Sequence, residues 1–223
     1  MEAGLAALRA AGDVPRYVLA LDVAGVYWAF AEEPERALEH TTEGLALARG
    51  RPHVGDLAMA LVGHATALIA LERLDEAEAL LDEAAPLIPQ LGASDVDADT
   101  FFDDLAAARG DWAHAARLFL ANARTTRGPG LKAMFLRHIA IALAHLGADE
   151  DALELAATAN AICESIGEAP SDPLTTRYGS ALDEARERLG PQRSAHATRR
   201  GLALPAGDST TRAAEMVQAA CLT

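Results

Sequence analysis

Aromatic residues are scarce in this chain of 223 residues, where Phe, Trp and Tyr together make up 4%. Strands favour aromatic and β-branched residues, so this scarcity disfavours a β-rich fold. Alanine and leucine supply most of the 51% hydrophobic content, and alanine is the best helix former. No stretch of about 18 residues is free of charge, so no membrane span is expected. The composition predicts a soluble, nearly all-helical protein.

Basic residues are in the minority, with 19 Lys plus Arg against 33 Asp plus Glu and a formal net charge of −14. Nucleic-acid binding needs a basic face that neutralises phosphates, so nucleic acid is not expected as a partner. Cys163 and Cys221 are too few for a disulfide framework or a metal site by themselves. The opening segment MEAGLAALRA lacks the cationic and long apolar parts of a signal peptide. We therefore expect a cytoplasmic protein.

Four segments of the chain repeat one pattern, in which a helix, a short polar turn and a second helix follow one another. They align on an alanine early in the second helix, at intervals of 40, 38 and 37 residues. Most residues seven positions after and twelve positions before that alanine are also small, which allows neighbouring helices to approach closely. The aligned alanines are Ala37, Ala77, Ala115 and Ala152; the later set is Gly44, Ala84, Asn122 and Ala159; the earlier set is Gly25, Ala65, Asp103 and Ala140.

On these residues the chain resembles the tetratricopeptide repeat family, which has small residues near positions 8, 20 and 27 of a 34-residue unit. The period here is longer, and Asp103 departs from the family pattern. The resemblance implies an all-α fold, a right-handed superhelix of antiparallel helix hairpins. One hairpin cannot bury both faces, so copies must stack.

Periodicity and helix breakers predict where the helices lie. We expect a repeat domain over 1–189, with repeats centred on 14–50, 54–91, 97–126 and 130–167 and with capping helices. Residues 190–223 are expected to form a connection and a closing helix. Pro86 and Pro89 predict a kink or an early end in one helix. The expected helices are 2–11, 14–31, 34–49, 54–72, 75–91, 97–109, 111–126, 130–146, 149–167, 172–189 and 209–221.

The tail carries a second resemblance. The segments ARERLG from Ala185 and RRGLAL from Arg199, followed by an amphipathic helix, are similar to the end of large bacterial signal-transduction ATPases of the LuxR/MalT-like kind. In that group the repeat region receives inducers or partner proteins and restrains a nucleotide-binding module. This chain has no G-x-x-x-x-G-K-[ST] loop. It is either an isolated sensor-like repeat domain or a small stand-alone relative.

The sequence contains few motifs that are typical of catalytic or metal-binding sites. The run Asp95-x-Asp97-x-Asp99 lacks the glycine and glutamate that a calcium loop needs, and Asp103-Asp104 has no third carboxylate at a metal-binding spacing. Neither cysteine has a recognisable catalytic partner. We expect no enzyme activity, no metal site and no cofactor. The arginines of the tail reverse the local charge, and pairing with the acidic body or with a partner is the simplest account of them.

The resemblance to tetratricopeptide repeats implies a concave groove lined by the first helix of each pair. The residues carried over to that groove are Asp22, Phe30, Thr66, Thr100, Asp104, Arg137 and His145, among apolar neighbours that include Val26 and Met59. We expect a non-catalytic protein-interaction or sensor domain of a bacterial transcriptional or signalling regulator that binds a protein or peptide. A small-molecule inducer, a self-associating scaffold or homo-oligomer, and an enzyme with an interior helical pocket remain alternatives.

Overall fold

The computed structural model of the chain describes residues 1–31, 33–88, 102–168 and 172–222. Within these ranges the regular structure is helical and no strand occurs, which confirms the expected all-α class. The chain divides into two compact units, Met1–Arg109 and Gly110–Thr223. None of the helices in the described ranges combines the length and apolar character that a membrane crossing requires.

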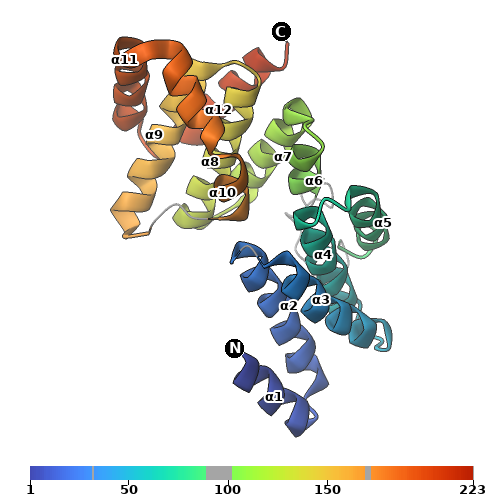
Figure 1. Cartoon of the computed structure of the whole chain (residues 1–223). Coiled ribbons are helices and arrows are strands. Elements are labelled where there is room, and N and C mark those ends of the chain that lie inside the picture. The colour runs from blue at the N-terminus through green and yellow to red at the C-terminus, as the bar shows by residue number, and fades with distance from the viewer. Residues whose placement is uncertain (32, 89–101, 169–171, 223) are drawn as a thin grey trace. The chain divides into compact units, whose positions relative to one another are not determined.

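The first unit is a series of helices in which neighbours in sequence pack side by side (Figure 1). Its helices are α1 (Glu2–Ala11), α2 (Val14–Phe30), α3 (Pro34–Arg49), α4 (Val54–Ala70), α5 (Leu74–Ala84) and α6 (Asp103–Ala108). Each of α2 to α4 contacts the next helix, and α2 also contacts α4. These contacts are those of stacked hairpins; the right-handed superhelix stays a prediction.

The second unit contains α7 (Trp112–Thr125), α8 (Pro129–His145), α9 (Asp149–Ile166), α10 (Pro173–Tyr178), α11 (Ser180–Ala203) and α12 (Ser209–Ala220). Helix α9 packs against both α8 and α11, and α12 packs against α7 and α8. The last two helices therefore belong to the same compact unit as the preceding hairpins. The expected division after residue 189 stays a prediction about folding domains.

Helix boundaries follow the local residues. Asp13 and Asp111 each cap a helix, because their carboxylates accept a backbone N–H three residues later, at 3.3 and 3.0 Å. Gly12 and Gly110 precede them with φ of 69° and 75°, a left-handed conformation that glycine adopts without steric cost. The predicted breaks at these positions are confirmed. Helix α5 also ends early, before Pro86, as expected.

Residues 190–208 were expected to form a connection that contains one short helix, and a helix does occur there, but it is longer than expected. Residues 191–203 continue α11 after a bend at Gly190, whose φ of 73° and ψ of 170° are not helical. Pro191 lies in the first turn of the resumed helix, where its missing N–H is not needed. The expected helix over 172–189 is likewise split between α10 and α11, while the closing helix agrees with α12.

The small residues of the repeat alignment lie at the helix seams. Ala37, Ala77, Ala115 and Ala152 are all fully buried, and Gly25 and Gly44 are buried as well. A side-chain carbon on Gly25 would collide with the methyl group of Thr41 on α3. The expectation that these positions set how closely helices approach is confirmed for the buried members. Asn122 and Asp103, the larger exceptions, are only partly buried.

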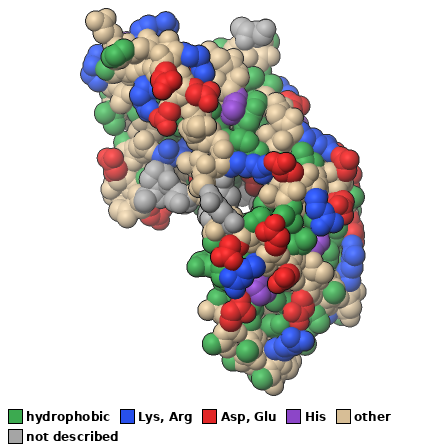
Figure 2. All heavy atoms as spheres, in the orientation of Figure 1, with side chains coloured by type: hydrophobic (Ala, Val, Ile, Leu, Met, Phe, Trp, Pro, Cys, Tyr) green, Lys and Arg blue, Asp and Glu red, His purple; other side chains and the backbone are tan. Residues whose placement is uncertain are grey.

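Glu154 on α9 ties the C-terminal segment to the second unit. Its side chain is almost fully buried and receives hydrogen bonds from Arg200 on α11 and Arg212 on α12. Arg188 and Arg193 pair with Asp149 and Glu150 at 2.7 and 2.8 Å. The expected pairing of the arginine-rich tail with the acidic body is confirmed. Figure 2 shows acidic and basic side chains intermingled over the visible surface of each unit.

A close contact between the backbones of α9 and α11 predicts a strong effect of a small substitution. A side-chain carbon on Gly201 of α11 would collide with the Glu154 carbonyl and the Ala157 methyl group of α9. We expect Gly201→Ala to lower the free energy of unfolding by about 1–3 kcal/mol, because rigid backbone must move. Urea unfolding followed by circular dichroism measures it. Gly207→Ala is the matched control, since no atom lies within 4 Å of the added carbon. Equal stability of the two variants would contradict the close contact.

Candidate functional site

An apolar stripe runs along the exposed side of α2. Leu19, Val23, Val26 and Tyr27 are 61%, 59%, 39% and 54% exposed, and their spacing of four, three and one residues places them on one face of the helix. Met59 on the adjacent α4 is 41% exposed. Solvated apolar residues gathered on one helix face are typical of interaction sites. We call this surface the α2–α4 face.

The sequence of α2 explains why apolar side chains lie on the exposed side of the helix as well as on its buried side. The helix is apolar around most of its circumference, as VPRYVLALDVAGVYWAF shows. Its other side packs into a core cluster with α1, in which Leu5, Tyr17, Leu21 and Ala24 are buried. A surface helix normally has one apolar side, which faces the core. A second apolar side on the same helix is typical of a surface that binds a partner.

Asp22 lies at the edge of the stripe, toward α4. Its Oδ1 atom is buried and has no hydrogen-bond partner among the described residues. The carboxylate lies directly over Gly63 of α4, where any side-chain carbon would collide with it. Burial raises the pKa of Asp22 to about 6. The close approach of α2 and α4 at a glycine thus holds an uncompensated carboxylate within an apolar surface.

The other residues predicted for the groove lie on several different helices. Thr66 lies on α4 one turn after Gly63, and its hydroxyl donates to the Val62 carbonyl of its own helix at 3.1 Å. Asp104 is the second residue of α6, and its backbone N–H donates to the Asp103 carboxylate at 2.8 Å. The backbone of Phe30 ends α2, its side chain is not described, and Thr100 lies outside the described residues.

Arg137 and His145 belong to the second unit, on α8. The His145 ring stacks on Trp112, with centroids 3.8 Å apart and planes 4° apart, and meets Tyr178 edge to face. Burial lowers the pKa of His145. This residue is therefore held in an aromatic cluster. Arg137 is only 8% exposed, and its Nε and Nη2 atoms are buried without a hydrogen-bond partner within the described ranges.

The sequence predicts Asp22, Val26 and Met59 for the concave groove, and this prediction does not include Leu19, Val23 and Tyr27 of the α2–α4 face. The resemblance to tetratricopeptide repeats assigns only a few groove positions in each repeat, and the other residues of the stripe are not among those positions. The apolar character of α2 around its whole circumference is the signal that could have found them.

Titratable side chains in the second unit offer little reactive chemistry. His138 Nε2 and Asp172 Oδ1 are 2.8 Å apart, and both residues are buried. Burial opposes ionisation of Asp172, but hydrogen bonds from His138 and Thr175 outweigh it and lower the pKa. Burial raises the pKa of the Cys163 thiol, whereas a nucleophilic cysteine needs a lowered pKa. The described residues contain no cluster of three or more His, Cys, Asp or Glu side chains that could hold a metal ion.

Comparisons with protein-family models, with curated proteins and with solved structures found no match to this chain.

The raised pKa of Asp22 predicts how stability depends on pH. The folded chain binds this proton more tightly than the unfolded chain, whose carboxyl keeps the ordinary pKa of 3.8. The penalty is therefore absent below about pH 4 and complete above about pH 6. We expect Asp22→Asn to raise the free energy of unfolding by about 1–2 kcal/mol at about pH 7.5, a value reduced for partial exposure, and to leave it unchanged at about pH 4.

Urea unfolding at the two pH values measures this difference. Asp82→Asn on α5 is the control, because Asp82 is exposed and its replacement is expected to change stability by less than about 0.5 kcal/mol at both values. An Asp22→Asn variant that is destabilised equally at both pH values would show that the carboxylate carries no burial penalty.

Proposed function

We propose that this chain is a non-catalytic protein-interaction domain, which binds an amphipathic helical segment of a partner protein on the α2–α4 face. The observation that carries the proposal is the exposed apolar stripe with the unpaired carboxylate of Asp22 at its edge. The resemblances to tetratricopeptide repeats and to the repeat region of LuxR/MalT-like regulators support the same kind of role. A bacterial transcriptional or signalling regulator is the setting we propose for it.

The geometry of the stripe favours a helical partner. From Leu19 to Tyr27 it extends over eight residues, or about 12 Å along the helix axis. A partner helix presenting apolar residues at positions i, i+3 or i+4, and i+7 matches this length. Strand addition would need an exposed sheet edge, and the described part of the chain has no strand.

Charge complementarity specifies one polar contact. Asp22 loses hydration in the fold, and its buried Oδ1 atom gains no hydrogen-bond partner within the described part of the chain. A lysine or arginine beside the apolar stripe of the partner would pair with it and remove that penalty, so such a pair favours the complex over the free chain. The net charge of −14 also attracts basic partners over distance.

Selection from a displayed library tests the proposal. The library presents helical peptides of about 18 residues with a fixed leucine stripe and randomised flanking positions. We expect peptides with a basic residue beside the stripe to be enriched on the unmodified chain. Val23→Glu should abolish their binding, because it places a charge within the stripe. Leu202→Glu is the control, since Leu202 on α11 is 59% exposed outside the α2–α4 face.

Two outcomes would overturn the proposal. One is equal enrichment on the unmodified and Val23→Glu chains, which would make the stripe irrelevant. The other is a dimer in sedimentation equilibrium that Val23→Glu dissociates, which would identify a second copy of the chain as the occupant. Loss of the preference for basic peptides in Asp22→Asn would assign that preference to the carboxylate.

A further inference from the structure

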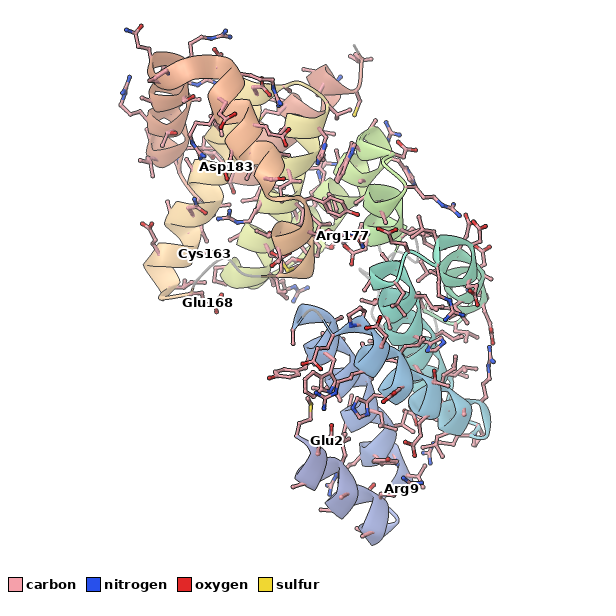
Figure 3. The ribbon with its side chains drawn as sticks, in the orientation of Figure 1. Glu2, Arg9, Cys163, Glu168, Arg177 and Asp183 are labelled. Atoms are coloured by element: carbon pink, nitrogen blue, oxygen red, sulfur yellow. The ribbon has the colours of Figure 1, made fainter. Side chains whose placement is uncertain are left out.

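A pocket of about 500 Å³ opens in the second unit, between the start of α8 and the end of α9. Leu131 and Met134 line it from α8, and Cys163 and Ile166 line it from α9. Figure 3 labels Cys163 on α9 and Glu168 just beyond the end of that helix. The volume lies within the usual range of small-molecule sites.

Arg137 is the charged group of this pocket. It lies on the same face of α8 as Gly130 and Met134, at spacings of seven and three residues, and it lines the cavity. The side chain is more than nine-tenths buried, and the buried Nε and Nη2 atoms have no hydrogen-bond partner in the part of the chain that is described. Burial lowers the pKa of the guanidinium, although the nearby charge of Asp172 acts in the opposite direction.

The carboxylates beside the pocket do not satisfy Arg137. Asp172 accepts hydrogen bonds from His138 and from both the backbone N–H and the hydroxyl of Thr175, at 2.8, 2.8 and 2.6 Å. These bonds fix Asp172 at the start of α10. Glu168 is exposed, and its carboxylate lies against Gly130 at the start of α8. Neither carboxylate therefore reaches the buried Nε and Nη2 atoms of Arg137, a residue that lines the cavity.

The same edge of arginine holds carboxylates elsewhere in this chain. Arg73 donates through Nε and Nη2 to the two oxygens of Glu76, at 2.7 Å each. Arg188 donates through Nε and Nη2 to Asp149, at 3.0 and 2.7 Å. In both pairs two parallel N–H groups match the two oxygens of one planar carboxylate. Arg137 carries the same kind of guanidinium and lines a cavity.

We propose that the pocket binds a small organic acid, whose carboxylate pairs with the guanidinium of Arg137 and whose apolar body lies against Leu131, Met134 and Ile166. This site belongs to α8 and α9 and does not depend on the α2–α4 face. Such a ligand gives the buried guanidinium its missing partner, so its binding stabilises the second unit.

A monocarboxylate fits this pocket better than a phosphate. Asp172 and Glu168 at the pocket repel anions, and a singly charged carboxylate meets less of this repulsion than a doubly charged phosphate. The apolar walls favour a hydrocarbon body, which inorganic phosphate lacks.

Matched probes on the full chain test the charge and the apolar body separately. Hexanoate and hexanamide have the same hydrocarbon chain, but only hexanoate carries a charge. We expect hexanoate to bind about tenfold more tightly than hexanamide in isothermal titration calorimetry. Butyrate should bind more weakly than hexanoate because it buries fewer methylene groups. Inorganic phosphate should not compete.

Two variants and the NMR signal of one methionine test whether hexanoate binds in this pocket. Arg137→Gln should abolish the preference for hexanoate over hexanamide without lowering the melting temperature, because it removes an uncompensated buried charge. Lys132→Gln, which removes a cation from the same helix outside the pocket lining, should bind like the unmodified chain. In methyl-labelled methionine NMR spectra, hexanoate should shift the signal of Met134 and leave Met59 and Met216 in place.

Three results would overturn the inference: no binding of hexanoate at millimolar concentration to the folded chain, equal affinity for hexanoate and hexanamide, or a shift of Met59 or Met216 in place of Met134. Should Arg137→Gln fail to fold, the probe comparison and the Met134 signal in the unmodified chain decide the question.

Discussion

Close contact between helices through small side chains is the constraint on which this structure depends. At the crossings of α2 with α3 and of α9 with α11, a glycine faces atoms that would collide with any side chain. Buried alanines such as Ala37 and Ala152 occupy equivalent seams. Seams of this kind bury little apolar surface per residue, because alanine offers only a methyl group. Polar anchors such as Glu154 with its two arginines consequently fix where the outer helices of the second unit lie.

Two buried charged groups differ from Glu154, whose carboxylate receives hydrogen bonds from two arginines. Glu154 shows that the fold can surround a buried ion with partners, yet the buried Oδ1 atom of Asp22 and the buried Nε and Nη2 atoms of Arg137 have no hydrogen-bond partner among the residues that the structure describes. An unpaired charge removed from water destabilises the folded state. Natural sequences depart from local optimisation mainly where function requires it. The two charges have opposite signs and lie in different surroundings, an open apolar stripe and an enclosed pocket, and these surroundings suit different classes of ligand.

Much of the fold could be predicted from local features of the sequence. Apolar periodicity and breakers such as Gly12-Asp13 act within a few residues, so they defined most helices and the all-α class. The predicted end of a helix at residue 189 agrees with the bend at Gly190, but the length of the helix that follows was not predicted, because a glycine with positive φ followed by a proline can bend a helix as well as end it. Asp22 and Arg137 were found through the repeat alignment, but burial and the absence of partners arise from neighbouring helices and cannot be read from spacing. Leu19 and Val23 were missed because their exposure depends on which side of α2 the other helices cover.

The attachment of α11 and α12 to Glu154 has a consequence for synthesis on the ribosome. The contacts that define the first unit involve only residues up to Arg109, so that unit can fold while the second is still being made. Glu154, in contrast, is synthesised 46 and 58 residues before the two arginines that pair with it. Until these arginines emerge, α9 carries an unpaired carboxylate on the side that α11 will cover. The second unit therefore completes its packing late, and during that interval α9 is open to proteases and chaperones.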